Sequence, residues 1–242
     1  MTDLHGAFAV VTGAAQGLGY AIAKAYTRAG LRLAIMDIQA EKLEAVAEEL
    51  RAAGGECTAI TVDLTDAEQT EAAIQRAMAL YGTPRVLVHN AAVLIERPLL
   101  EISLATWQRE IAIALQAAYQ LTYAVWQRMT DAGGGSIVYV SSRAGIEGFP
   151  NGSSYCAAKH GLEGLMKSLS AEGKPRNIAV NTITPGMYMH TPMSERNYPE
   201  ELKSQWVDPI RLTPAFVFLA RQDGSGVTGQ RLNAWELSQE QL

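Results

Sequence analysis

The chain has 242 residues, of which 48% are apolar and 19% are charged, and its formal net charge is −5. This composition excludes intrinsic disorder, which needs low hydrophobicity and a high net charge. It also disfavours nucleic-acid binding, because a net-acidic chain without lysine and arginine runs offers no clustered charge to phosphates. The length suits one α/β domain with a sizeable core.

The sequence indicates a protein that works away from membranes. The longest apolar stretch, 111–126, is interrupted by Gln116 and Gln120, so we expect no bilayer span. The N-terminus has no basic region before its apolar residues and does not resemble a secretory signal. The two cysteines, Cys57 and Cys156, form no disulfide framework, and we therefore expect a reducing, cytoplasmic location and no metal centre.

Short apolar runs alternate with helical patterns from the first residues onward. Six runs bounded by turn-forming residues predict buried strands at 7–13, 31–37, 58–63, 85–90, 136–142 and 177–183. Between them, apolar residues recur at helical spacing, as at Leu18, Ile22 and Tyr26. This alternation predicts right-handed crossovers and a parallel sheet with helices on both faces, in a single doubly wound, Rossmann-like domain spanning 1–242.

Three segments of the later chain stand out within this pattern. Capping-box spacing at 65–68 predicts the start of a helix that runs towards Tyr81. A long helix is expected from Leu104 to Met129, ending before three glycines. The stretch 186–207 follows a predicted strand and has no regular pattern, and since ligands of such sheets bind beyond the carboxyl ends of strands, we interpret it as a substrate lid.

The first predicted strand ends in a glycine-rich loop, TGAAQGLG at 12–19. Gly13 suits a tight turn, while Gly17 and Gly19 allow the backbone to approach a ligand and the sheet. The helix that follows would present free N–H groups and a positive dipole end to a pyrophosphate. We therefore predict a dinucleotide site, with Gln16 and Leu18 also in the loop that contacts the cofactor.

Asp37, at the end of the second predicted strand, indicates which dinucleotide binds. An acid at this separation from the glycines is placed to accept hydrogen bonds from the ribose diol. It would repel a 2′-phosphate by up to about 4 kcal/mol per unit charge at about 4 Å and an effective dielectric near 20. No basic residue is adjacent in the sequence, so NAD is predicted rather than NADP.

Tyr155 and Lys159 lie four residues apart in a segment with good helical propensity, so they share one helix face. An ammonium about 4 Å from a phenol, at an effective dielectric near 20, would favour the phenolate by about 4 kcal/mol, or roughly three pKa units. Tyr155 is therefore predicted to be a general acid/base. Ser142, at the end of a neighbouring strand, could polarise a substrate oxygen, although Ser141 is an alternative.

Taken together, these residues resemble the short-chain dehydrogenase/reductase family over nearly the whole chain. The resemblance rests on the glycine loop, Asp37, Asp63-Leu64, HNAA (89–92), Ser142, YCAAK (155–159) and Pro185-Gly186. It selects Ser142 over Ser141, because Ser142 lies thirteen residues before Tyr155, and it implies that Ser142, Tyr155 and Lys159 are catalytic. It further implies that Lys159 holds the nicotinamide ribose, that Asp63 and Leu64 contact the adenine, that Asn90 lies along the cofactor, and that Pro185, Gly186 and a threonine, here Thr191, lie at the nicotinamide end.

Some positions depart from the family pattern. Many members carry an asparagine that holds a relay water where this chain has Ala114, and the usual NNAG is HNAA, which begins with His89. The family threonine commonly lies five residues after the proline, whereas Thr191 lies six after Pro185. The tail, 232–242, also differs from the usual acidic-Gly-Gly ending.

The leading hypothesis is an oxidoreductase that transfers hydride between NAD(H) and a secondary alcohol or ketone. The alternatives are an NADPH-linked reductase of an acyl-thioester or quinone-like carbonyl, and a cofactor-binding module that has lost catalysis. Apolar residues of the lid and polar ones such as Glu96 and Arg143 give conflicting indications of substrate polarity. The resemblance and the apolar surface of the 104–129 helix imply a homotetramer or homodimer.

Overall fold

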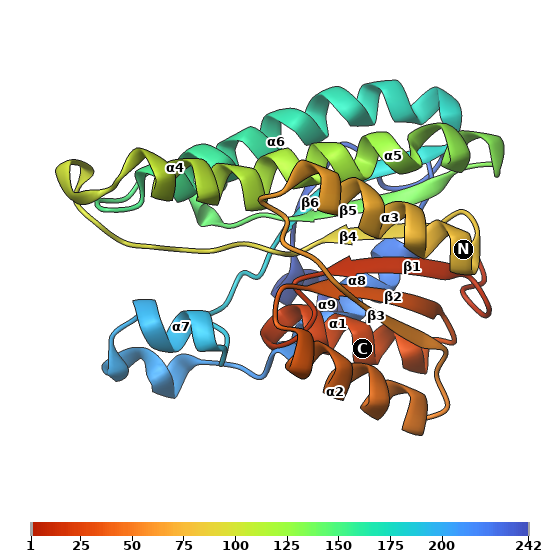
Figure 1. Cartoon of the computed structure of the whole chain (residues 1–242), viewed down its shortest axis with the longest axis horizontal. Coiled ribbons are helices and arrows are strands. Elements are labelled where there is room, and N and C mark those ends of the chain that lie inside the picture. Colours follow the sequence, from red (N-terminus) through yellow and green to blue (C-terminus); the bar gives the residue numbers. More distant parts are fainter. Residues whose placement is uncertain (1, 242) are drawn as a thin grey trace.

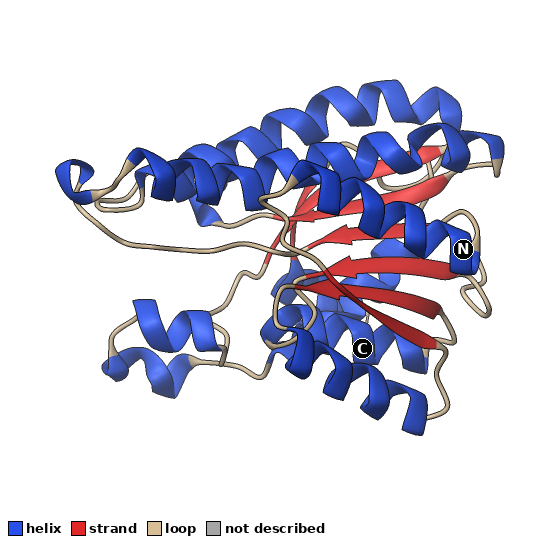
Figure 2. Ribbon diagram, viewed as in Figure 1, coloured by secondary structure: helices blue, strands red, loops and turns tan. Residues whose placement is uncertain are grey.

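A seven-stranded, fully parallel sheet forms the centre of the molecule (Figure 2). The structure is a computed structural model that describes residues 2–241. The strands are β1 (Phe8–Thr12), β2 (Arg32–Asp37), β3 (Cys57–Thr61), β4 (Val86–His89), β5 (Gly135–Val140), β6 (Ile178–Thr184) and β7 (Arg231–Asn233). Their order is β3-β2-β1-β4-β5-β6-β7, so the chain reverses its direction of winding between β1 and β4. The predicted Rossmann-like fold is confirmed.

The six predicted strands are all present, and their residues are almost completely buried in β1, β4, β5 and β6. Continuous apolar runs fold in this way because helices cover both faces of a parallel sheet. The seventh strand, β7, was not predicted. It has only three residues, each partly exposed, and pairs in parallel with the end of β6.

Helices cover the two faces of the sheet as two separate groups (Figure 1). One core cluster joins the sheet to α1 (Gly17–Arg28), α2 (Ala40–Ala52), α8 (Thr213–Ala220) and α9 (Ala234–Glu240). The other joins it to α3 (Ala67–Tyr81), α5 (Ala117–Asp131) and α6 (Ser153–Gly173), beside which lies α4 (Leu104–Ile111). None of the helices within 2–241 is long and apolar enough to cross a membrane.

The long helix predicted for 104–129 is present, but it contains an irregularity. A π-helical turn, Ala112–Gln116, separates α4 from α5. Such turns insert one extra residue into the helical ladder and are frequent at functional sites. Helical spacing alone did not reveal it, because the residues of the turn remain good helix formers.

Two further segments differ from the sequence expectations. The stretch 186–207 is not irregular: it contains α7 (Pro192–Asn197) and a 3₁₀ turn, Glu200–Gln205, because Thr191 caps α7 and Pro192 occupies its first position. Helix α3 begins one residue later than its capping box predicted, because the side chain of Asp66 accepts the N–H groups of Glu68 and Gln69.

Candidate active site

The carboxyl ends of β1 and β4 meet where the winding of the sheet reverses, which is the usual ligand site of open α/β folds. The glycine loop leaves β1 at this point and enters α1. Gly13 has a φ of 66°, and a Cβ there would lie 2.8 Å from Asn90 Nδ2. At Gly19 a Cβ would lie 2.1 Å from the carbonyl oxygen of Gly13. Both positions therefore require glycine for the loop to keep this shape.

The loop fits a pyrophosphate. Gln16, the N-cap of α1, makes no side-chain capping hydrogen bond, so the first N–H groups of the helix are not capped from that position. The first turn of α1 also carries no acidic side chain that would repel an anion. The predicted loop residues Gly17 and Leu18 form the start of the helix, with Gly17 at a φ of 60°. The geometry suits the dinucleotide cradle expected from the sequence.

Asp37 ends β2 beside this loop and is buried, with 9% of its surface exposed. One carboxylate oxygen accepts the N–H of Ala15 at 3.1 Å, and the other accepts the N–H of Gln39 at 3.0 Å. These two bonds orient the carboxylate at the mouth of the site and leave it further lone pairs with which to accept ribose hydroxyls.

A cation that was not predicted lies beside the glycine loop and the residues that follow Asp37. Lys42, the third residue of α2, donates to Gln16 Oε1 at 3.3 Å and to Gln39 Oε1 at 2.9 Å. Lys42 is five residues from Asp37 in the sequence, and it reaches the loop because the first turn of α2 lies beside Gln16. No base is adjacent to Asp37 in the sequence, but the fold brings Lys42 to the same loop.

Asn90 supports the loop from β4. Its side-chain amide donates to the carbonyl oxygens of Thr12 at 3.1 Å and Gly13 at 3.0 Å. The amide thus holds the end of β1 and the first loop glycine together. At the neighbouring edge, Asp63 Oδ1 accepts both the N–H and the hydroxyl of Thr65, and Leu64 is buried in the core.

The two serines at the end of β5 point to different partners. Ser141 is 2% exposed and donates to Glu163 at 2.5 Å, inside the protein. Ser142 instead starts a 3₁₀ turn, Arg143–Gly145, where its hydroxyl accepts the N–H of Ala144. A hydrogen bond from Ser142 also acts on Tyr155, where it lowers the pKa of the phenol against the effect of burial. Ser142 is therefore the serine that meets the tyrosine.

Tyr155 and Lys159 lie on one face of α6, as their spacing predicted. The Lys159 ammonium lies 5.4 Å from the centre of the Tyr155 ring and donates to the carbonyl oxygen of Val140 at 2.7 Å. Lys159 is only 2% exposed and Tyr155 only 9%. The structure thus brings Ser142, Tyr155 and Lys159 together at the carboxyl ends of β4 and β5.

The electrostatics of this pair differ from the sequence expectation. Burial raises the pKa of Tyr155 above its ordinary value, rather than the ammonium lowering it. Burial also lowers the pKa of Lys159 to about 8, which the carboxylate of Glu163 partly offsets. The desolvation that both groups undergo inside the protein outweighs the attraction between the two charges, because burial disfavours the charged form of each group.

The remaining predicted cofactor residues gather around the end of β6. Gly186 has a φ of 77°, and a Cβ there would lie 1.8 Å from Asn233 Oδ1, while Pro185 accepts the N–H of Trp235. The tail of the chain therefore folds back onto this site through β7 and α9. Thr191 also lies at the glycine loop, since its Cγ2 would be 3.3 Å from a Cβ at Gly17. Its hydroxyl accepts the N–H of Ser194, which caps α7.

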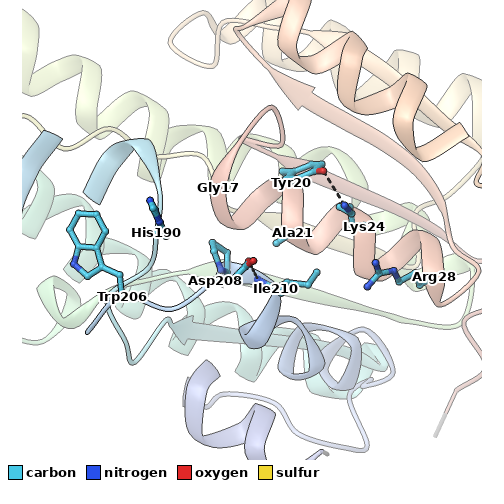
Figure 3. A pocket seen from close by; sticks show the side chains of 10 residues that line it. Gly17, Tyr20, Ala21, Lys24, Arg28, His190, Trp206, Asp208 and Ile210 are labelled. Atoms are coloured by element: carbon cyan, nitrogen blue, oxygen red, sulfur yellow. Dashed lines mark hydrogen bonds between the residues drawn. The ribbon is translucent and has the colours of Figure 1, made fainter. Parts of the chain in front are cut away.

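A cavity of about 580 Å³ lies between α1 and residues 190–210, and Ser142, Tyr155 and Lys159 do not line it. Figure 3 shows α1 residues on one side of it and residues of the 187–210 segment, including His190 and Trp206, on the other. Lys24 in this cavity is paired with Glu49 at 2.9 Å. The cavity touches the glycine loop only at Gly17, so it borders the candidate site without containing its reactive groups.

Glu110 is a buried acid near the site that sequence reasoning missed. It is 1% exposed and lies on α4, where it accepts the N–H of Ile95 at 2.7 Å and the hydroxyl of Ser154. It thus ties the loop after β4 to the residue before Tyr155. A carboxylate on an amphipathic helix is normally solvated, and its pattern alone gave no sign of this burial.

Known proteins match this chain over most of its length. A family model described as short chain dehydrogenase matches residues 7–202. A D-threitol dehydrogenase of Mycolicibacterium smegmatis is 35% identical over 238 residues, covering 95% of this chain and 91% of the relative. A 3-oxoacyl-(acyl-carrier-protein) reductase of Chlamydia muridarum is 34% identical over 235 residues, covering 93% of this chain and 94% of the relative. A solved structure of a putative NAD(P)-dependent gluconate 5-dehydrogenase from Beutenbergia cavernae, with NADP bound at low occupancy, superimposes with a TM-score of 0.89 at 31% identity, covering 97% of this chain and 98% of that one.

Proposed function

The chain belongs to the short-chain dehydrogenase/reductase family and is an oxidoreductase, and we propose that it transfers hydride between NAD(H) and a secondary alcohol or ketone. The observation that carries this proposal is the buried pairing of Tyr155 and Lys159 at the carboxyl end of β5. A buried lysine next to a buried phenol is unfavourable for stability alone, and such arrangements cluster at sites of acid/base chemistry.

In the proposed reaction Tyr155 exchanges a proton with the substrate oxygen at its phenol Oη. Ser142 orients that oxygen with its hydroxyl. The nicotinamide, when bound, accepts or supplies the hydride. Because burial raises the pKa of Tyr155, the phenol is held protonated at neutral pH and is ready to donate to a ketone oxygen. Burial lowers the pKa of Lys159 to about 8, so near neutrality a fraction of its amine is neutral and can accept the phenol proton at Nζ. The Tyr155 phenolate left behind then takes the proton of the alcohol in the oxidative direction.

The cofactor is proposed to extend from the β2 edge to the end of β6. Gly13, Gln16, Gly17, Leu18 and Gly19 would hold the pyrophosphate, and Asp37 the adenosine ribose. By the family resemblance, Asp63 and Leu64 would contact the adenine, Asn90 would lie along the cofactor, and Lys159 would hold the second ribose. Pro185, Gly186 and Thr191 would surround the nicotinamide.

NAD is proposed as the preferred cofactor because Asp37 would repel a 2′-phosphate. A second candidate, NADPH-linked reduction of an acyl-thioester or quinone-like carbonyl, has a specific observation in its favour. Lys42 lies within hydrogen-bond distance of Gln16 and Gln39, next to the proposed ribose site, and would attract that phosphate. One relative is a reductase of an acyl-carrier-protein substrate.

The segment 186–207 is proposed to act as a substrate lid. Its two ends are joined to each other, since Val207 donates to the carbonyl oxygen of Tyr188 and accepts from the N–H of His190, both at 2.9 Å. The body between these ends, α7 and the following 3₁₀ turn, projects from the sheet (Figure 1). A segment closed at its base is able to move as a unit over the site.

The protein is also proposed to form a homotetramer or homodimer. Apolar side chains stay exposed along the outer surface of the 3₁₀ turn at 99–101, α4 and α5. They are Leu99, Leu100, Leu104, Trp107, Tyr119 and Tyr123, with exposed fractions from 38% to 98%. A surface of this kind on a folded chain is typical of an interface, and closed symmetry is the usual outcome.

A substrate panel tests the proposed reaction. Purified protein is assayed with linear polyols, cyclic secondary alcohols and the corresponding ketones, each with NAD(H) and NADP(H), by the absorbance of the reduced nicotinamide. Turnover of a secondary alcohol with NAD as the better cofactor is expected. Turnover confined to an acyl-thioester or a quinone with NADPH would replace the proposal with the second candidate.

A further inference from the structure

His89 ends β4 and is 1% exposed. Its Nδ1 lies 3.1 Å from the hydroxyl oxygen of Thr12, at the end of β1. Its Nε2 lies 3.0 Å from the carbonyl oxygen of Ile113, inside the π-helical turn Ala112–Gln116. One imidazole therefore connects the strand that enters the glycine loop to the irregular turn between α4 and α5.

The hydrogen bonds around Thr12 determine which nitrogen of His89 carries the proton. The Thr12 hydroxyl oxygen accepts the N–H groups of Asn90 and Ala91, both at 3.1 Å. A hydroxyl has two acceptor lone pairs and a single hydrogen, so this hydrogen is left for His89 Nδ1. Nδ1 is then the acceptor, and Nε2 carries the proton that it donates to Ile113.

This bond matters because of what a π-helical turn does to the backbone. In the turn, the N–H of Ala117 bonds to the carbonyl oxygen of Ala112, five residues back, rather than four. The local ladder is displaced, and buried carbonyl groups there gain from a donor outside the helix. His89 supplies such a donor to Ile113, one residue before the buried Ala114.

The π-helical turn lies directly against the helix that carries the reactive pair. At Gly161, two residues after Lys159, a Cβ would lie 2.5 Å from Leu115 of the turn. Burial and the charge of Lys159 together lower the pKa of His89 to about 3, so the imidazole stays neutral at any working pH. It acts as a fixed hydrogen-bonding link and not as a titrating group.

We propose that His89 is a positioning residue. Its Nε2–H fixes the turn 112–116 to the end of β4, and the turn, which packs against α6 at Gly161, thereby keeps Lys159 placed to exchange its proton. The effect of His89 on catalysis rests on the proposed function, whereas its effect on the structure of the turn 112–116 does not. It also assigns a use to a residue that stands where the family pattern has asparagine. An asparagine side chain is too short to bond both Thr12 and Ile113 as the imidazole does.

The first test reads the tautomer in the unaltered protein. The four histidines are labelled with ¹⁵N, and the His89 signals are identified by their loss in His89→Gln. From pH 5 to 8 we expect a neutral ring with its hydrogen on Nε2. A hydrogen on Nδ1, or protonation within this range, would overturn the proposal without any measurement of activity.

A pair of variants separates the two nitrogens of the ring. His89→Gln keeps a donor near the Nε2 position, while His89→Asn keeps an acceptor near Nδ1 and loses the donor. We expect kcat for alcohol oxidation to stay within about threefold of wild type in His89→Gln and to fall at least about tenfold in His89→Asn. KM for NAD should change less than about twofold, and the solvent deuterium isotope effect on kcat should grow in His89→Asn.

Hydrogen exchange distinguishes this proposal from the proposed function. Exchange of the 110–118 amides should speed up in His89→Asn but not in His89→Gln, whether or not the substrate has been found. The control is His160→Asn, which alters an exposed histidine on α6 and should change neither kcat nor the exchange rate of the 110–118 amides. Equal losses in both His89 variants, unchanged exchange in His89→Asn, or a fall in kcat that only follows the loss of thermal stability would each refute a positioning role.

Discussion

Replacement of Lys159 by methionine should separate the stability of this protein from its activity. The methionine side chain has nearly the same length and apolar stem but carries no charge. The ammonium of Lys159 is 2% exposed, and its pKa is lowered from 10.5 to about 8. The folded state therefore holds a proton on this group less readily than the unfolded state does.

The size and direction of the effect follow from proton linkage. A pKa difference of about 2.5 corresponds to about 3 kcal/mol of unfavourable free energy when the lysine is charged, below pH 8. Between pH 8 and 10.5 the unfolded chain binds more protons than the folded one, so wild-type stability rises with pH. Methionine binds no proton. The advantage of Lys159→Met over wild type should accordingly shrink by about 2 kcal/mol between pH 7 and pH 10.

The assay is urea unfolding of both proteins at the two pH values. The absolute difference at pH 7 also includes the unpaired carbonyl of Val140, which Lys159 normally contacts, so the change with pH is the decisive quantity. Lys167→Met, on an exposed part of the same helix, is the matched control, and its difference from wild type should be constant. A Lys159→Met difference that does not change with pH, or that grows, would refute this account of the buried charge. The Lys159→Met protein should also lose its dehydrogenase activity.

Three further predictions concern the cofactor, the acid limit of stability and the assembly. Wild type should prefer NAD over NADP by at least about tenfold in kcat/KM, and a preference for NADP would contradict the role of Asp37. Asp37→Ala should reduce this preference for NAD, whereas Lys42→Gln should increase it. Because the pKa of His89 falls from 6.5 to about 3 on folding, stability should decrease as the pH is lowered through this range, and thermal unfolding of His89→Gln should show a shallower decrease. Light scattering at micromolar concentration should give a dimer or tetramer that Tyr119→Glu/Tyr123→Glu dissociates, and a wild-type mass of 26.1 kDa would exclude the proposed assembly.

The sequence predicted the sheet and the residues of the site better than it predicted their environment. Buried parallel strands are continuous apolar runs, and six of them were recognisable for that reason. The i, i+4 spacing of Tyr155 and Lys159 placed both on one helix face, as the structure has them. Each of these features depends only on residues that are near one another in the chain, so it can be recognised in a single sequence.

Features that depend on long-range packing were missed. Lys42 approaches the glycine loop only because α2 folds back towards it, and Glu110 is buried only because Ser154 and Ile95 meet it from other segments. The predicted direction of the Tyr155 pKa shift was wrong for the same reason, since desolvation depends on all the residues packed around the phenol. The strand β7 was too short to leave a pattern of its own.

The measurement that tests the central claim most directly is the activity of Tyr155→Phe. The change removes the phenol oxygen and keeps the ring that is packed beside Leu94 and Ala144. General acid/base catalysis contributes about 10²- to 10⁴-fold, so kcat/KM should fall at least about a hundredfold. Calorimetry should find the NAD affinity within about threefold of wild type, with an unchanged fold by circular dichroism. A Tyr155→Phe protein that binds NAD and keeps most of its dehydrogenase activity would contradict the proposed mechanism.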